Sequence, residues 1–103
     1  MAQVRELYGF RKKGQGVIPV VTAVHPSAID RFLGAASERE RTEHLRGLRD
    51  IGVLVHEKNS LRQLVVESDT GWRGKVYVFR GPAWTVPRVT RKRRGSRVRV
   101  FTA

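Results

Sequence analysis

The chain has 103 residues, of which 40% are hydrophobic, and its 21 Lys and Arg against 9 Asp and Glu give a net charge of +12. This length suits one domain with a modest core, and the hydrophobic share excludes a chain that is disordered by composition. There is no cysteine, no apolar run near the roughly 20 residues of a membrane span and no apolar signal core at the start, so we expect a cytoplasmic protein without membrane contacts.

The chain begins with an expected strand pair over residues 3–24. Two valine-rich stretches, VRELYGF and GVIPVVTAV, flank the basic loop RKKGQG, and β-branched residues favour strands. The glycines of the loop allow a tight turn, which carries Lys12 and Lys13. Pro19 cannot donate a hydrogen bond, so the second strand is expected to lie at an edge or to start after it. A helical turn over residues 3–8 is the alternative.

A short helix is expected over residues 26–34, PSAIDRFLG. Ser27 is placed as its N-cap with Asp30 three residues further on, and Gly34 can end the helix in the left-handed conformation. Helical spacing puts the apolar side chains on one side: Ile29, Phe32 and Leu33.

A longer helix is expected over residues 38–51, after a four-residue connection. Ser37 and Glu40 form a capping box, in which the serine oxygen accepts from an early amide and the glutamate reaches back. The apolar stripe of this helix consists of Leu45, Leu48 and Ile51. Gly52 is a natural stop.

After this helix the hydrophobic period changes to that of strands. Residues 53–57 and 61–67 are expected to form a hairpin around the turn residues 58–60. A third strand is expected over KVYVFR, residues 75–80. The two prolines of GPAWTVP indicate an extended linker over residues 81–87.

The basic charge is concentrated at the end of the chain. Residues 70–103 carry ten bases and no acid, and such a one-sided field attracts polyanions, most commonly nucleic acid. In RVRVF, Arg and Val alternate, which puts the valines on one face of a strand and Arg97 and Arg99 on the other. This alternation favours a basic β-ribbon over residues 88–102 rather than a flexible tail.

Two helices joined by a Gly-containing turn and followed by a hairpin resemble a winged helix-turn-helix DNA-binding domain. The resemblance covers SAIDRFLGAASERERTEHLRGLRDIGVLVHEKNSLRQLVV, about half the chain, with WRGKVYVFR as a further wing strand. It implies an α+β, winged-helix-like fold with flanking N- and C-terminal strands. It also implies that the second helix lies in the major groove of DNA and that the wing contacts backbone or minor groove.

The outer side of the long helix is the expected reading surface. Its residues toward DNA are Arg39, Thr42, Arg46 and Arg49. An arginine there can bond guanine through two donors or contact a phosphate. Glu43 and Asp50 share this side and would repel phosphates unless they pair with arginines or accept from cytosine. The alternative is a solvated face laced with ion pairs between residues i and i+4.

The other expected contacts are cations outside this helix. They are Lys58, Arg62, Arg73 and Lys75 beside the wing, Arg88, Arg91, Lys92, Arg93, Arg94, Arg97 and Arg99 in the terminal segment, and Lys12 and Lys13 in the first loop. The sequence thus predicts non-enzymatic binding of duplex DNA by a small regulator or accessory factor, with residues 88–99 on phosphates. The oligomeric state is left open, with a homodimer as one option.

Two further partner classes fit the sequence. RNA or single-stranded nucleic acid would stack on aromatic side chains of a basic sheet, namely Trp72, Trp84, Tyr77 and Phe79. The tryptophans can instead cover the edge of a small core. A phage- or plasmid-type module that binds an acidic protein is the third interpretation.

No group of residues indicates catalysis or a cofactor. The histidines, His25, His44 and His56, have spacings that match no zinc site. The carboxylates are scattered and suggest no two-metal centre. We therefore expect neither an enzyme nor a bound metal.

Overall fold

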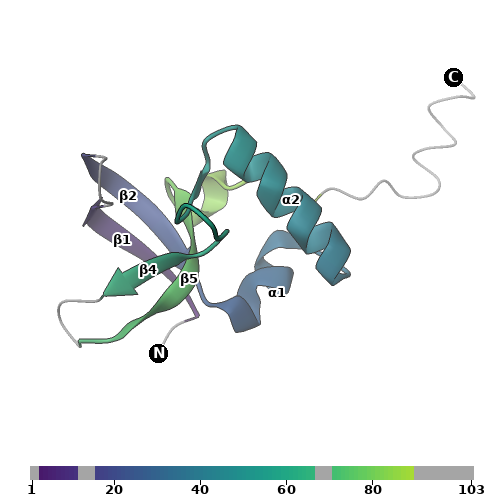
Figure 1. Cartoon of the computed structure of the whole chain (residues 1–103), viewed down its shortest axis with the longest axis horizontal. Coiled ribbons are helices and arrows are strands. Elements are labelled where there is room, and N and C mark those ends of the chain that lie inside the picture. Colours follow the sequence, from purple (N-terminus) through teal and green to yellow (C-terminus); the bar gives the residue numbers. More distant parts are fainter. Residues whose placement is uncertain (1–2, 12–15, 67–70, 90–103) are drawn as a thin grey trace, which may run out of the picture.

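A computed structural model describes residues 3–11, 16–66 and 71–89 of the chain (Figure 1). The elements are, in chain order, β1 (Val4–Arg11), β2 (Val17–Val24), the 3-10 turn η1 (Pro26–Ala28), α1 (Ile29–Leu33), α2 (Glu38–Asp50), β3 (Leu54–Val55), β4 (Gln63–Val66), β5 (Arg73–Arg80) and the 3-10 turn η2 (Ala83–Thr85). The predicted α+β class is confirmed, with two α-helices at one end of an antiparallel sheet of five strands. The sheet order is β1-β2-β5-β3, and β4 pairs with β5.

The first two strands form the antiparallel pair that the sequence predicts. Val4 lies opposite Val24, and the alternative of a helical turn over residues 3–8 is wrong. The expectation for Pro19 is also wrong, because β2 begins before it and lies between β1 and β5. Pro19 is instead accommodated opposite Gly9, the one position at which the pairing of β1 with β2 is interrupted. The missing N–H of proline explains the interruption.

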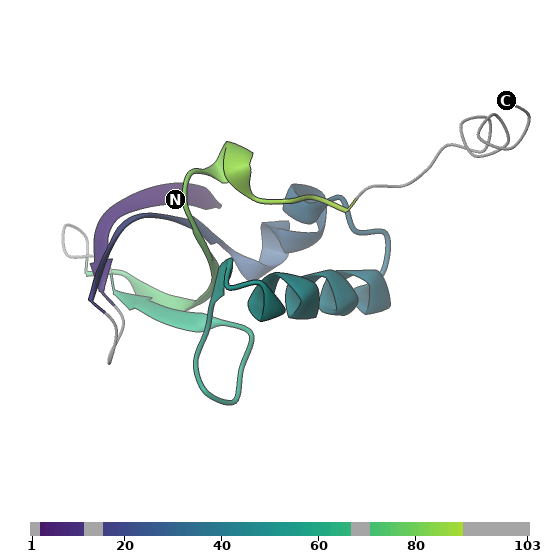
Figure 2. The same ribbon diagram turned by 90° about the horizontal axis from the view of Figure 1, so that it is seen from above.

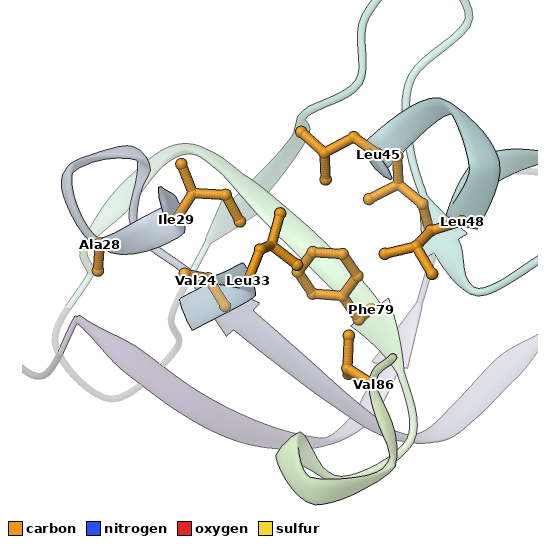
Figure 3. Close-up of a cluster of buried hydrophobic side chains, with 9 residues drawn as sticks. Val24, Ala28, Ile29, Leu33, Leu45, Leu48, Phe79 and Val86 are labelled. Carbon is orange, nitrogen blue, oxygen red and sulfur yellow. The ribbon is translucent and has the colours of Figure 1, made fainter. Parts of the chain in front are cut away.

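The sheet has a hydrophobic core on each face. Along β5, Tyr77 and Phe79 point toward the helices, whereas Val76 and Val78 point to the opposite face. The first core lies between sheet and helices (Figure 3) and consists of Val24, Ala28, Ile29, Leu33, Leu45, Leu48, Leu54, Phe79 and Val86. The second core lies inside the curve of the sheet (Figure 2) and consists of Val21, Val55, Val65, Val76 and Val78. β5 is covered on both faces, which explains its continuous apolar run.

Gly9 allows two side chains that do not alternate to reach the second core. Leu7 and Phe10 are three residues apart, so strict alternation would place them on opposite faces of β1. Gly9 has a φ of 71°, a left-handed angle that residues with a Cβ adopt only with strain. Both Leu7 and Phe10 pack against the second core.

The predicted hairpin over residues 53–67 is wrong. β3 and β4 do not pair with each other, and each pairs instead with β5. The connection between them is closed by a hydrogen bond from the Glu57 N–H to the Arg62 carbonyl, at 3.1 Å. In the sequence, the two apolar runs and the polar turn are compatible with a hairpin between β3 and β4. In the structure, both runs pair instead with β5, a strand that is buried on two faces. The hairpin that does form joins β4 to β5, so the wing of a winged helix is not seen between β3 and β4.

The long helix begins and ends as predicted, with one exception. Ser37 accepts a hydrogen bond from the Glu40 N–H at 3.1 Å, and the Glu40 carboxylate accepts from the Ala36 N–H at 2.7 Å. Gly52 has a φ of 82° and directly follows Ile51, the C-cap of α2. Ile51 is 67% exposed and does not belong to the apolar stripe, because the chain has left the helix at this position.

The short helix is preceded by a cap that differs from the prediction. Gly34 ends α1 with a φ of 79°, as expected. The N-cap prediction for Ser27 is wrong, because the ring of His25 accepts from the Ser27 N–H at 3.1 Å and caps η1. The chain passes from η1 into α1 without a further side-chain cap.

The extended linker predicted between the prolines is also wrong. Residues 83–85 form η2, and Val86 is only 3% exposed within the first core. The Val89 N–H then donates to the Leu33 carbonyl at 2.8 Å, which fixes the chain to the end of α1. Two prolines favour an extended backbone locally, but a buried valine between them brings the segment onto the core. From residue 90 onward, the predicted β-ribbon lies outside the described residues.

Candidate nucleic-acid interface

The structure brings together the residues that the sequence places on the reading surface of α2. Arg39, Thr42 and Arg46 line one shallow hollow on the helix, together with Ser37, Glu38 and Glu43. Arg49 lies in the last turn of the same helix. Arg39, Thr42 and Arg46 thus lie on one side of α2, as their spacing of three or four residues predicts.

The charges on this helix cancel. The Nε of Arg39 lies 3.1 Å from a carboxylate oxygen of Glu43, and the Nε of Arg49 lies 3.3 Å from Asp50. α2 has four arginines and four acids, a net charge of zero. Arg46 is exposed and forms no ion pair with another described residue. Phosphates would therefore meet a face without net attraction.

Arg41 forms an ion pair that sequence reasoning missed. Its guanidinium lies 3.0 Å from the Asp30 carboxylate, and the arginine side chain is only 24% exposed. The pair joins α2 to α1 across a separation of 11 residues. No periodicity signals such a pair, because the turn between the two helices sets the distance.

Two predicted cations share a face of the hairpin formed by β4 and β5. Arg73 lies opposite Val66 and Lys75 lies opposite Leu64, and paired residues of antiparallel strands point to the same face. The Lys75 Nζ lies 3.2 Å from Glu57, whereas Arg73 is exposed and forms no ion pair with another residue of the described part. Lys58 and Arg62 are exposed in the connection between β3 and β4.

Arg88 is engaged within the chain. Its guanidinium lies 4.0 Å from the centroid of the Phe32 ring, and it also donates to the Ala83 carbonyl at 2.9 Å. A cation held over an aromatic ring stabilises the folded protein, so Arg88 has a structural role of its own. The other predicted contacts lie outside the described residues: Lys12, Lys13, Arg91, Lys92, Arg93, Arg94, Arg97 and Arg99.

Charge is divided unevenly between the two halves of the fold. Residues 25–52, which contain the helices, carry five arginines and five acids, so their net charge is zero. The described parts of 3–24 and 53–80, which contain the strands, carry seven cations and two acids, a net of +5. Both acids are held internally, because Glu6 accepts a backbone N–H at 3.1 Å and Glu57 accepts from a lysine at 3.2 Å and a backbone N–H at 3.0 Å. The sheet half therefore carries most of the net positive charge of the described chain, to which Arg88 adds one further cation.

Only some of the predicted stacking aromatics are accessible. Phe79 is fully buried, and Tyr77 and Trp72 are half-buried against the two cores. Trp84 is 83% exposed on η2, and Tyr8, which the sequence did not single out, is 75% exposed on β1. The alternation of β1 would have revealed Tyr8, since Leu7 beside it faces the second core.

The histidines do not form a metal site. No group of three metal-binding side chains comes together within the described ranges. The Nε2 of His44 lies 2.8 Å from the Pro87 carbonyl oxygen, so this ring joins α2 to the segment after η2. Of the helices in those same ranges, none has the length and apolar character needed to cross a bilayer.

Comparison of the chain with protein families, with curated proteins and with solved structures found no match.

Proposed function

We propose that this chain binds nucleic acid without catalysing a reaction, and that its sheet half and basic terminal segment contact the phosphates. The observation that carries the proposal is the division of charge: net zero over the helices and +5 over the described strand segments. Cations displayed on a rigid scaffold release condensed counterions when they neutralise phosphates. Seven further cations follow β5 in residues 81–103, with no acid.

The proposal gives α2 a smaller role than a recognition helix would have. Two of its outward arginines are neutralised by neighbouring acids, and such pairs weaken attraction to a phosphate. Duplex DNA remains the first partner class, because it presents about one negative charge per 1.7 Å of axis to a rigid cationic surface.

Single-stranded nucleic acid is the second candidate, favoured by one observation. Tyr8 and Trp84 are the two most exposed aromatic side chains among the described residues. The Glu6 carboxylate accepts from the Ala83 N–H, which places η2 beside β1. Exposed aromatics beside a cationic sheet suit the stacking of unpaired bases.

A competition titration at two salt concentrations tests the proposal. Labelled duplex DNA would be displaced by unlabelled duplex DNA, single-stranded DNA or duplex RNA, with the full chain at 50 and 200 mM salt. Neutralisation of six to ten phosphates lowers affinity by roughly 10³ to 10⁵ over this interval. Salt-independent binding, or no binding to any of the three, would overturn the proposal. Displacement by the single strand at lower concentrations than by the unlabelled duplex would select the second candidate.

A further inference from the structure

We propose that the free edge of β1 binds an extended, acidic peptide segment of a partner protein as an added β-strand. The peptide would lie in the groove between β1 and β4. This proposal does not depend on nucleic-acid binding, although the groove belongs to the same sheet half.

The groove lies between the two outer strands of the curved sheet. It has a cavity volume of about 580 Å³ and is lined by residues 5–11 of β1 and 64–66 of β4. Figure 2 shows β1 and β2 arching over one side of the curve and β4 and β5 forming the other. Within the described part of the chain, each lining strand has one paired neighbour, β2 for β1 and β5 for β4.

The outer edge of β1 offers peptide groups that pair with no backbone group of the described residues. The His25 N–H donates to the Gln3 carbonyl at 2.7 Å, so the peptide groups of Gln3 face β2. Alternate residues of an antiparallel strand direct these groups to opposite sides. The N–H and C=O of Glu6 and Tyr8 therefore point away from β2. No backbone hydrogen bond from the described chain reaches them on that side.

In β4, by contrast, the outward peptide groups of Leu64 are bonded within the chain. The Leu64 N–H donates to the Glu57 carboxylate at 3.0 Å, and the Gln63 side chain donates to the Leu64 carbonyl at 3.2 Å. Exposed strand edges are commonly blunted in this way, because an open edge pairs with other chains. Among the residues that the structure describes, no side chain bonds the outward peptide groups of Glu6 or Tyr8 in this way, so β1 is the strand that can accept a partner.

The side chains of the groove select an acidic, partly apolar peptide. Leu7 and Phe10, which are half-buried against the second core, supply apolar surface to the groove. Arg5 and Arg11 are the first and last lining residues of β1. The acid of the lining, Glu6, is already bonded to the Ala83 N–H. Arg11 is exposed, and its positive charge disfavours pairing with β1 of a second copy and favours alternating apolar and acidic side chains.

A peptide fits this edge better than a nucleic-acid strand does. The edge presents donors and acceptors in alternation, and both kinds need a partner when the groove is filled. A sugar-phosphate backbone supplies acceptors but no N–H donors. Only another polypeptide in extended conformation satisfies both at the spacing of a strand.

Amide hydrogen exchange on the full chain tests the proposal with the synthetic peptide acetyl-EVEVEVE-amide as the probe. We expect slowed exchange at the amides of Glu6 and Tyr8, and unchanged exchange at Arg5 and Leu7, which already face β2. The Leu64 amide should also stay unchanged, because Glu57 holds it. The same peptide with all of its backbone amides N-methylated should not bind, whichever set of amides faces β1.

Charge-reversal variants supply the matched control. Arg11→Glu should weaken the acidic peptide by about tenfold or more, and Arg31→Glu, the same change on an exposed arginine of α1, should not. Equal protection of Arg5 and Glu6, undiminished binding of the N-methylated peptide, or equal effects of both variants would overturn the proposal. So would self-association through β1, or the same exchange pattern with a DNA oligonucleotide. A duplex-DNA titration of the same sample separates this failure from failure of the nucleic-acid proposal.

Discussion

The guanidinium of Arg88 covers the face of the Phe32 ring, with its central carbon 4.0 Å from the ring centroid. Phe32 in turn stacks on Phe79 at a centroid distance of 5.7 Å. Together with the bond from the Val89 N–H to the Leu33 carbonyl, this contact ties the start of the basic terminal segment to α1. The terminal cations therefore begin at a fixed point on the fold.

Replacing Arg88 should destabilise the protein rather than only reduce its charge. Arg88→Ala removes a cation–π contact and a hydrogen bond to Ala83, and we expect a loss of about 1 to 2 kcal/mol in the free energy of unfolding. Urea denaturation measures this loss. Arg31→Ala, the same charge change on an exposed side chain without an ion pair in the described chain, should shift stability by less than about 0.5 kcal/mol. Equal losses would show that Arg88 acts through net charge alone.

Two Gly→Ala changes should have opposite signs. Gly9 has a φ of 71°, and alanine in the left-handed region costs about 1 to 2 kcal/mol. Gly47 lies inside α2, and a methyl group added to it would meet open space, so Gly47→Ala should stabilise by about 0.5 to 1 kcal/mol. Thermal or chemical denaturation of both variants provides the comparison. A stabilising Gly9→Ala would contradict the role of this residue in β1.

Replacing a buried and an exposed aromatic residue should distinguish an effect on stability from an effect on binding. Phe79→Ala empties a fully buried position of the first core and should cost about 3 to 5 kcal/mol, which we expect to unfold much of the protein. Trp84→Ala, at an 83% exposed position, should leave stability within about 0.5 kcal/mol. Circular dichroism during urea titration measures both. If Trp84→Ala also lowers affinity for single-stranded DNA but not for duplex DNA, the stacking interpretation gains support.

Removing the densest terminal charge should flatten the salt dependence of binding. The fourfold change of Arg91, Lys92, Arg93 and Arg94 to alanine removes up to four phosphate contacts, which reduces the slope of log affinity against log salt by about 3 to 4. Affinity should fall for all sequences alike, because phosphate contacts carry no base information. Fluorescence anisotropy over a salt series measures the slope. A slope that stays unchanged would show that these cations do not contact the phosphates.

The local features of the fold were predictable where neighbouring residues decide them. The capping of α2 by Ser37 and the left-handed stop at Gly34 depend on a few adjacent positions, and both are confirmed. The partner of β3 was not predictable, because the same apolar run pairs equally well with either neighbour. The buried position of Val86 likewise depends on contacts with α2 and β5 that no short window contains.

In the candidate site, too, the features set by local sequence were predictable and those set by tertiary packing were not. Helical spacing correctly placed Arg39, Thr42 and Arg46 on one surface. Ion pairs within the helix are a predictable alternative for such a face, but the ion pair between Arg41 and Asp30 depends on how two helices pack. The free edge of β1 could not be inferred, since an edge is defined by the order of strands in the sheet.

The central claim is that the sheet half, and not the helices, contacts the phosphates. Two double variants with equal loss of charge test it: Arg62→Ala with Arg73→Ala on the sheet side, and Arg31→Ala with Arg46→Ala on the helices. All four side chains are exposed, and none forms an ion pair with another residue of the described ranges. Salt-dependent titration with duplex DNA should give a slope smaller by about 2 for the sheet variant and unchanged for the helix variant. A helix variant that loses as much slope as the sheet variant, or more, would contradict the account.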